Sequence, residues 1–454
     1  MLQSIDPSTG RLLHEYREAD PAQVDSALDQ AAAAFPGWRS RSHADRAQVL
    51  RRAGALLRER SAALAVLMAE EMGKPVAQGR AEAEKCATAC DYFADSAATF
   101  LAPEPVRTDA TRSYVAFEPL GVVLGVMPWN FPLWQVFRFA VPTLLAGNVC
   151  VLKHASNVSG AALAIEALLR EAGAPTGVFT TLLVGSGAVE GIIASPHVRA
   201  VSLTGSTPAG RAVAAAAGRA LKKAVLELGG SDPYVVLEDA DLDVAVPACV
   251  QARLVNTGQS CIAGKRFIVV EPVRAAFTER FVASMKAKRF GDPKDQANDL
   301  GPMARVDLRD QLHAQVQATV KGGARLLCGG KVPPGPGAWY PPTVLDGVRP
   351  GTPAYAEELF GPAAAILGAR DEADAIRIAN DTPFGLGAAV FTRDASRGER
   401  IAAEALEAGS CFVNAFVRSD ARLPFGGVKE SGYGRELAAL GIREFVNAKT
   451  IYVA

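Results

Sequence analysis

The chain has 454 residues, of which 49% are hydrophobic, so it is long enough for about three domains with large apolar cores. Lysine plus arginine equals aspartate plus glutamate at 48 each, which leaves no net charge to attract nucleic acid or anionic lipid. No segment of about 18 uncharged apolar residues occurs, and the first residues lack the basic and apolar parts of a secretory signal. We therefore expect a soluble cytoplasmic protein that binds neither nucleic acid nor a membrane.

The seven cysteines are an odd number scattered along the chain, which indicates reduced thiols rather than a disulfide framework. Cys86 and Cys90 lie four residues apart, but no second pair or neighbouring histidine completes a metal-binding set. We expect no bound metal.

Residues 21–100 are rich in alanine with charged residues at helical spacing, which predicts successive amphipathic helices with a break at Pro36 and Gly37. The segment 113–132, SYVAFEPLGVVLGVMPWNFP, is β-branched and apolar and predicts a strand followed by a turn. Strands and helices then alternate. The segments concerned are strands at 149–156, 179–185 and 200–206, with a helix at 160–173.

A second alternating region runs from about 233 to 430 and includes DPYVVLEDAD, KRFIVVEP and GAAVFTRD. Such alternation is typical of βαβ units. The pattern therefore predicts an α/β fold with two parallel-sheet domains.

The segment NTGQSCIAG, residues 256–264, sets Cys261 among glycines and small polar residues. A lone cysteine is usually a small buried hydrophobe, but Gly258 and Gly264 allow close backbone approach. Cys261 is therefore a candidate nucleophile. None of the five histidines lies in a Cys–His protease pattern, so backbone dipoles or a cationic cofactor ring are the expected source of thiolate stabilisation.

Two further segments contain polar residues beside glycine turns. VSLTGSTPAGR, residues 201–211, reads as a strand, then Gly205 and Ser206, then a helix whose N-terminus is suited to a phosphate; an ordinary turn is the alternative. VLELGGSDP, residues 225–233, places Glu227 at the end of an apolar strand. A buried carboxylate there indicates a general base, and a solvated glutamate is the alternative.

The segment MPWNFP, residues 127–132, holds Asn130 between aromatic residues and prolines. An amide fixed in this way could donate to a developing oxyanion, although a turn-forming asparagine has the same pattern. EELFGP, residues 357–362, contains Glu358 and Phe360 before a Gly-Pro turn and by itself says little.

In this order and at these separations, PWNFP, LTGSTPAG, LELGG, NTGQSC, EELFGP and PFGGVKESGYGRE resemble the aldehyde dehydrogenase superfamily over essentially the whole chain. LGVMPWNFPLWQ, VLKHASN and SDARLPFGGVKESG are similar to the shorter bacterial succinate-semialdehyde dehydrogenases of that superfamily. The resemblance implies that Cys261 is the nucleophile, on a flexible loop, that Glu227 is the general base and that Asn130 donates to the oxyanion. It also implies NAD or NADP as cofactor.

For the cofactor, the resemblance places Trp129 and Asn130 beside the nicotinamide, and Glu358 and Phe360 at the nicotinamide ribose. It also places Gly205 and Ser206 at the pyrophosphate, and Lys153 at the adenosine ribose. Many NAD-specific members have a glutamate where this chain has Ser156. Because a carboxylate there would repel a 2′-phosphate, we expect NADP to be accepted as well as NAD.

For the substrate, larger succinate-semialdehyde dehydrogenases have an arginine at the position of Arg138 that binds the distal carboxylate. A second arginine of those enzymes is replaced here by Val255. We expect Arg418 or Arg422 to replace its charge, with Arg422 preferred, and Trp134 and Phe425 to form apolar walls.

The resemblance further implies a nucleotide-binding domain of residues 1–100 and 120–231 and a catalytic domain of residues 232–431. A hairpin at 101–119 and a tail at 432–454 are expected to join subunits into a homodimer or homotetramer. The expected reaction is oxidation of succinate semialdehyde to succinate. Alternatives are another small aldehyde, an enzyme that transfers the acyl group to coenzyme A, and a non-catalytic descendant, which intact Cys261, Glu227 and Asn130 disfavour.

Overall fold

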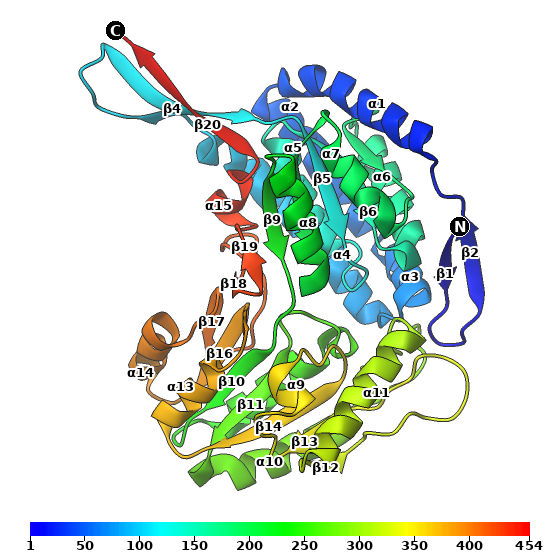
Figure 1. Cartoon of the computed structure of the whole chain (residues 1–454), viewed down its shortest axis with the longest axis vertical. Coiled ribbons are helices and arrows are strands. Elements are labelled where there is room, and N and C mark those ends of the chain that lie inside the picture. The colour runs from blue at the N-terminus through cyan, green and yellow to red at the C-terminus, as the bar shows by residue number, and fades with distance from the viewer.

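The computed structural model describes all of residues 1–454 and has two lobes and a projecting arm (Figure 1). The chain begins with an antiparallel hairpin of β1 (Leu2–Ile5) and β2 (Leu12–Tyr16), which the sequence pattern did not indicate. Four helices follow. They are α1 (Pro21–Arg39), α2 (His43–Glu59), α3 (Ser61–Met72) and α4 (Val76–Phe100).

The predicted helix break at Pro36 and Gly37 is wrong, because α1 continues to Arg39. The backbone N–H of Ser40 still donates to the carbonyl of Pro36, so helical bonding passes the proline. Trp38 holds this last turn in place, since its ring is buried and its indole N–H donates to the Leu144 carbonyl at 3.0 Å.

The first lobe has a six-stranded sheet in the order β19-β9-β8-β5-β6-β7, with only β19 antiparallel to its neighbour. Its strands are β5 (Val122–Met127), β6 (Val149–His154), β7 (Phe179–Thr181), β8 (Val198–Thr204), β9 (Lys223–Glu227) and β19 (Gly432–Tyr433). The helical segments between them are α5 (Trp134–Leu145), η1 (Ser156–Val158), α6 (Ser159–Glu171), η2 (Ser186–Ala188), α7 (Val189–Ala194) and α8 (Thr207–Arg219).

The second lobe has a seven-stranded sheet in the order β12-β13-β14-β11-β10-β16-β17, in which only β12 and β13 pair antiparallel. Its strands are β10 (Asp232–Val236), β11 (Gly264–Val270), β12 (Arg325–Cys328), β13 (Thr343–Asp346), β14 (Ala363–Ala369), β16 (Gly387–Phe391) and β17 (Ser410–Val413). Beside it lie α9 (Leu242–Leu254), η3 (Val255–Gly258), α10 (Glu271–Lys286), α11 (Val306–Lys321), α12 (Pro353–Ala356), α13 (Glu372–Asn380), α14 (Ala395–Arg400) and η4 (Ile401–Ala405), with the short pair β15 (Phe384–Gly385) and β18 (Val428–Lys429).

The second sheet is buried on both faces, as its continuous apolar strands predict. Val235 and Ile268 belong to one core cluster, whereas their strand neighbours Val236 and Phe267 belong to another. Because successive side chains of a strand point to opposite faces, these clusters are the two layers on either side of the sheet.

The arm is a three-stranded antiparallel sheet of β3 (Glu104–Pro105), β4 (Arg112–Pro119) and β20 (Val446–Val453), which extends away from both lobes (Figure 1). The segment 113–132 is therefore two strands in different sheets, β4 and β5, rather than one. The predicted tail of 432–454 also divides, because β19 joins the first sheet and α15 (Ala438–Ile442) follows it, and only β20 lies in the arm. None of the helices is both long and apolar enough to cross a membrane.

Candidate active site

The residues predicted to act together converge where two sheet edges face each other. Glu227 ends β9, and Asn130 follows β5, so both lie at the carboxyl edge of the first sheet. Cys261 and Glu358 precede β11 and β14, at the amino edge of the second. Ligands of open α/β sheets bind beyond the carboxyl ends of the strands. The loops of the second sheet that contain Cys261 and Glu358 therefore face the edge of the first sheet where a ligand is expected.

The loop before Cys261 has an unusual backbone. Asn256 and Thr257 both have φ of 54° and Gly258 has φ of 73°. A Cβ on Gly258 would lie 2.4 Å from backbone atoms of Gly361, so this position requires glycine. Left-handed backbone at a β-branched threonine costs about 1–3 kcal/mol, and such strain persists only where the surroundings impose it.

Rather than being flexible, as predicted, the loop is fixed by buried side chains. Lys265 is 1% exposed, and its Nζ donates to the carbonyls of Ser260 at 2.9 Å and Cys261 at 2.7 Å. The same ammonium lies 3.2 Å from Oε1 of Glu358. Lys265 therefore connects the backbone of the predicted nucleophile to the carboxylate predicted for the nicotinamide ribose.

Cys261 is partly exposed, whereas Cys86, Cys90, Cys150 and Cys249 are buried. Burial of the thiol raises the pKa of Cys261 to about 12, against the opposing charges of Arg138 and Lys265. The protein alone therefore holds a protonated thiol at neutral pH, and a further positive charge near the sulfur would favour the thiolate.

Glu227 is 1% exposed, and neither of its carboxyl oxygens has a hydrogen-bond partner. Burial, followed by the charge of Glu436, raises the pKa of Glu227 above that of an ordinary glutamate. A Cβ on Gly426, in the PFGG segment, would lie 2.9 Å from Oε1 of Glu227. Glu227 is therefore an unsatisfied buried carboxyl group able to take a proton near neutral pH, as a general base requires.

Asn130 is buried, and its Nδ2 donates to the carbonyl of Gln259, two residues before Cys261, at 3.2 Å. Its own backbone carbonyl accepts from Nδ2 of Asn256 at 2.6 Å. The amide is thus fixed against the cysteine loop with one N–H still available, which fits the predicted oxyanion donor.

The predicted substrate arginine, Arg138, is 2% exposed and forms an ion pair with Glu436, which the sequence reasoning did not single out. Its Nη2 also donates to Oγ1 of Thr204 at 3.2 Å, and its guanidinium lies 4.6 Å from the ring centroid of Phe425. Arg138 and Phe425 are therefore adjacent as expected, but the charge of Arg138 already has a carboxylate partner.

The other predicted substrate residues differ in burial. Trp134, at the start of α5, is buried, and its indole N–H donates to Oγ of Ser419 at 3.1 Å. Arg422 is exposed and paired with Asp420 at 2.6 Å, and the Arg418 guanidinium lies 5.9 Å from the Phe416 ring centroid. Both arginines are exposed, so neither is a buried, unpaired cation that could bind a substrate carboxylate.

The residues predicted to surround the nicotinamide and its ribose make two sets of contacts. Glu358 accepts from the backbone N–H of Gly230 at 3.1 Å, and a Cβ on Gly229 would lie 2.6 Å from its Oε2. Trp129 meets Phe360 edge to face at 5.7 Å. A Cβ on Gly230 would lie 2.7 Å from the Cys261 carbonyl oxygen, so close approach explains both glycines of the LELGG segment. A carboxylate and a pair of aromatic rings suit a ribose and a nicotinamide.

The predicted phosphate and adenosine residues lie at neighbouring strand ends. Ser206 caps α8 without using its side chain, and a Cβ on Gly205 would meet nothing closer than 3.7 Å, so the helix N-terminus is open to an anion. Lys153 lies near the end of β6, and burial lowers its pKa. Ser156 begins η1 and is exposed. These residues fit a dinucleotide that extends across the ends of β8, β5 and β6.

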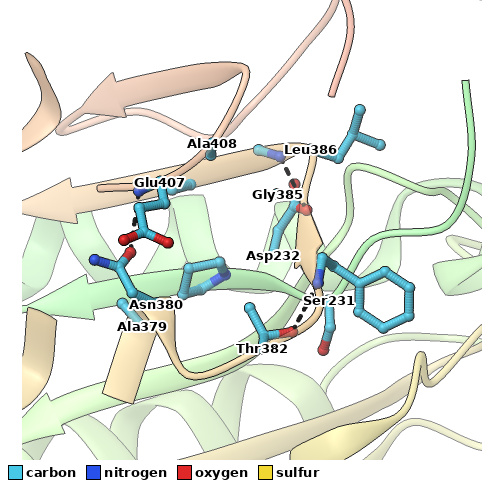
Figure 2. A pocket seen from close by; sticks show the side chains of 13 residues that line it. Ser231, Asp232, Ala379, Asn380, Thr382, Gly385, Leu386, Glu407 and Ala408 are labelled. Carbon is cyan, nitrogen blue, oxygen red and sulfur yellow. Dashed lines mark hydrogen bonds between the residues drawn. The ribbon is translucent and has the colours of Figure 1, made fainter. Parts of the chain in front are cut away.

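A separate cavity lies deeper in the second lobe (Figure 2). It is lined by Asp232, Asn380, Thr382 and Glu407, among others, and offers about 10 Å³, which is room for one water molecule. Oδ2 of Asp232 has no partner, and burial raises the pKa of this carboxyl to about 7. A water there would satisfy Asp232, and the cavity is too small for an aldehyde or a cofactor.

Comparison with known proteins agrees with this geometry. The profile of the Aldehyde dehydrogenase family matches residues 1–451. The chain is 49% identical over 449 residues, covering 99% of this chain and 97% of the relative, to the succinate semialdehyde dehydrogenase [NAD(P)+] Sad of Escherichia coli (strain K12). It is 47% identical to a probable succinate-semialdehyde dehydrogenase [NADP(+)] of Synechocystis over the full length of both chains.

A solved structure, succinic semialdehyde dehydrogenase from Streptococcus pyogenes with NADP+, matches with a TM-score of 0.97 and 36% identity over all of both chains. The chain belongs to the aldehyde dehydrogenase family and has its fold, which confirms both predictions. The family match makes it an aldehyde dehydrogenase, an enzyme that oxidises aldehydes.

Proposed function

We propose that the enzyme oxidises succinate semialdehyde to succinate, with Cys261 as nucleophile, Glu227 as general base and Asn130 as oxyanion donor. The observation that carries the proposal is the convergence of a partly exposed thiol, an unsatisfied buried carboxyl and a fixed amide between the two sheets. Relatives named for this substrate, 46–49% identical over essentially the whole chain, support the choice of aldehyde.

In the proposed reaction, the thiol of Cys261 gives up its proton to a solvent water molecule and its sulfur bonds to the aldehyde carbon. The carbonyl electron pair moves to oxygen, where Nδ2 of Asn130 and the backbone N–H of Cys261 donate hydrogen bonds. Bound NAD(P)+ supplies the acceptor for the hydride that leaves this carbon. The product of this stage is a thioester on Cys261.

Hydrolysis of the thioester requires a base. Glu227 takes a proton from water, whose oxygen bonds to the thioester carbon, and the sulfur leaves as thiolate. The raised pKa of Glu227 suits this role, because a stronger base accepts the proton more readily. Water rather than coenzyme A is the proposed acyl acceptor because this base is in place.

For the cofactor, we propose that both NAD+ and NADP+ bind, with Trp129 and Asn130 beside the nicotinamide and Glu358 and Phe360 at the nicotinamide ribose. Gly205 and Ser206 face the pyrophosphate and Lys153 and Ser156 the adenosine ribose. The exposed hydroxyl of Ser156, in place of a carboxylate, and the names of the relatives support acceptance of both cofactors.

We further propose a homodimer or homotetramer joined through the arm. β20 is an edge strand of the arm sheet, and Tyr452 and Val453 are 54% and 41% exposed. An edge strand with exposed apolar residues is a template for pairing with another chain. A cytoplasmic location is also proposed, in keeping with seven free cysteines.

The test is a comparison of kcat/KM for succinate semialdehyde and butanal, each with NAD+ and NADP+. A charge-assisted contact to the distal carboxylate predicts that succinate semialdehyde is preferred by about ten- to a hundredfold. Equal values for the two aldehydes would contradict the proposed substrate. Formation of a coenzyme A thioester when coenzyme A is added would contradict the proposed hydrolysis.

A further inference from the structure

Lys85, on α4, is a cation next to the predicted substrate wall that the sequence reasoning did not identify. Its Nζ donates to Oγ of Ser419 at 2.7 Å and lies 4.2 Å from the ring centroid of Trp134. Trp134 donates its indole N–H to the same hydroxyl oxygen at 3.1 Å. An ammonium, a hydroxyl and an indole from three distant parts of the chain therefore meet at one point.

The charges around this point leave Lys85 without a counter-ion. Glu82 pairs with Lys74, Glu436 with Arg138, and Asp420 with Arg422, whereas no carboxylate lies within ion-pair distance of Lys85. Burial and the nearby charge of Arg138 lower the pKa of Lys85 to about 8. A desolvated cation without a partner is unfavourable unless an anion joins it.

The hydrogen bonds at Ser419 leave a donor free. Its oxygen accepts from both Lys85 and Trp134, so its single O–H proton is available to a third group. Lys85 itself has three N–H donors and uses one on Ser419. Trp134 lies one helical turn before Arg138 on α5, and the charge of Arg138 acts on both Lys85 and Cys261, which connects the cluster to the nucleophile through one shared residue.

We infer that Lys85, together with the hydroxyl of Ser419, binds the distal carboxylate of the aldehyde substrate, in place of the arginine that Val255 replaces. The inference rests on the proposed function. Arg138 adds positive potential nearby but keeps Glu436 as its partner. The ring of Trp134 covers the short carbon chain between the carboxylate and the aldehyde.

The test compares Lys85→Met with Arg422→Met as a matched control. Methionine keeps the length and packing of lysine without its charge. We expect Lys85→Met to raise KM for succinate semialdehyde and to lower kcat/KM by about ten- to a hundredfold, with butanal almost unchanged. Arg422→Met should change neither substrate by more than about twofold, since its ion pair is exposed.

A pH profile provides the second readout. The ratio of kcat/KM for succinate semialdehyde to that for butanal should fall as the pH rises through about 8, where free Lys85 loses its proton. The groups facing Lys85 are Arg138 on α5, Asp420 in the loop before β18, and Glu82 and Cys86 on α4 itself. Titration of enzyme groups that affect both aldehydes equally cancels in this ratio. In Lys85→Met the ratio should not change with pH.

Three outcomes separate the claims. If wild-type enzyme does not prefer succinate semialdehyde, the proposed function fails. If wild-type enzyme prefers it and Lys85→Met does not reduce the preference, the role of Lys85 is wrong. If Lys85→Met loses activity on both aldehydes alike, while its thermal unfolding and cofactor KM match wild type, Lys85 acts on the chemistry and not on the carboxylate, which also overturns the inference.

Discussion

At the scale of the residue, Ser156 is placed to decide which cofactor is accepted. It is exposed at the start of η1, and Lys153 lies three residues earlier at the end of β6. A carboxylate at position 156 would repel the 2′-phosphate of NADP, while NAD has only a hydroxyl there. Serine neither repels the phosphate nor requires the hydroxyl.

Ser156→Glu should therefore lower kcat/KM for NADP+ by about tenfold or more while changing that for NAD+ by less than about twofold. Ser156→Gln has the same length without the charge and should affect the two cofactors equally. The measurement is steady-state kinetics with a saturating aldehyde. Equal losses with both cofactors in Ser156→Glu would mean that this residue does not face the ribose.

Individual residues also show the limits of sequence reasoning. Cys261, Glu227 and Asn130 could be predicted because each lies in a segment whose glycines and prolines mark an unusual turn. Lys85 and Lys265 could not, because one lies in an alanine-rich helix and the other is the second residue of a strand, where a lone lysine usually faces solvent. Lys85 contacts Ser419, 334 residues away, and Lys265 contacts Glu358 and two backbone carbonyls, and the sequence pattern does not show these contacts.

At the scale of the element, periodicity predicted most of the helices and strands but not which sheet each strand joins. β4 and β5 lie in one apolar run of sequence but join different sheets, and the turn between them contains Gly121 with a positive φ of 132°. The helix α1 continues past Pro36 because Trp38 is buried beyond it. Contacts distant in sequence therefore decided both where the apolar run divides and where α1 ends.

The proposed subunit contact through the arm can be tested by shortening β20. Removal of residues 449–454 takes away most of β20 and should convert the oligomer to a monomer, because the exposed edge for pairing is lost. Light scattering after size-exclusion chromatography measures the mass, and circular dichroism checks that the two lobes remain folded. A truncated protein of unchanged oligomeric mass would show that subunits join elsewhere, and a monomeric wild type would contradict the proposed assembly.

At the scale of the whole molecule, the reaction depends on two lobes that supply different groups. Glu227 and Asn130 come from the first lobe, and Cys261 and Glu358 come from loops of the second (Figure 1). The buried link from Lys265 to Cys261 and Glu358 keeps the second set together. Because Cys261 and Glu227 come from different lobes and act in different steps, a substitution of Glu227 should slow thioester hydrolysis without preventing thioester formation.

The most direct test of the account uses Glu227→Gln with succinate semialdehyde and NADP+. The sulfur and the cofactor remain, so the thioester should form, but without the base its hydrolysis should be slow. Mass spectrometry of the quenched protein should then find a succinyl group on Cys261, with about one reduced cofactor released per subunit, and no such adduct in the double variant Glu227→Gln, Cys261→Ala. A succinyl group on another residue such as Cys328 or Cys411, or no covalent adduct with undiminished turnover, would contradict the central claim.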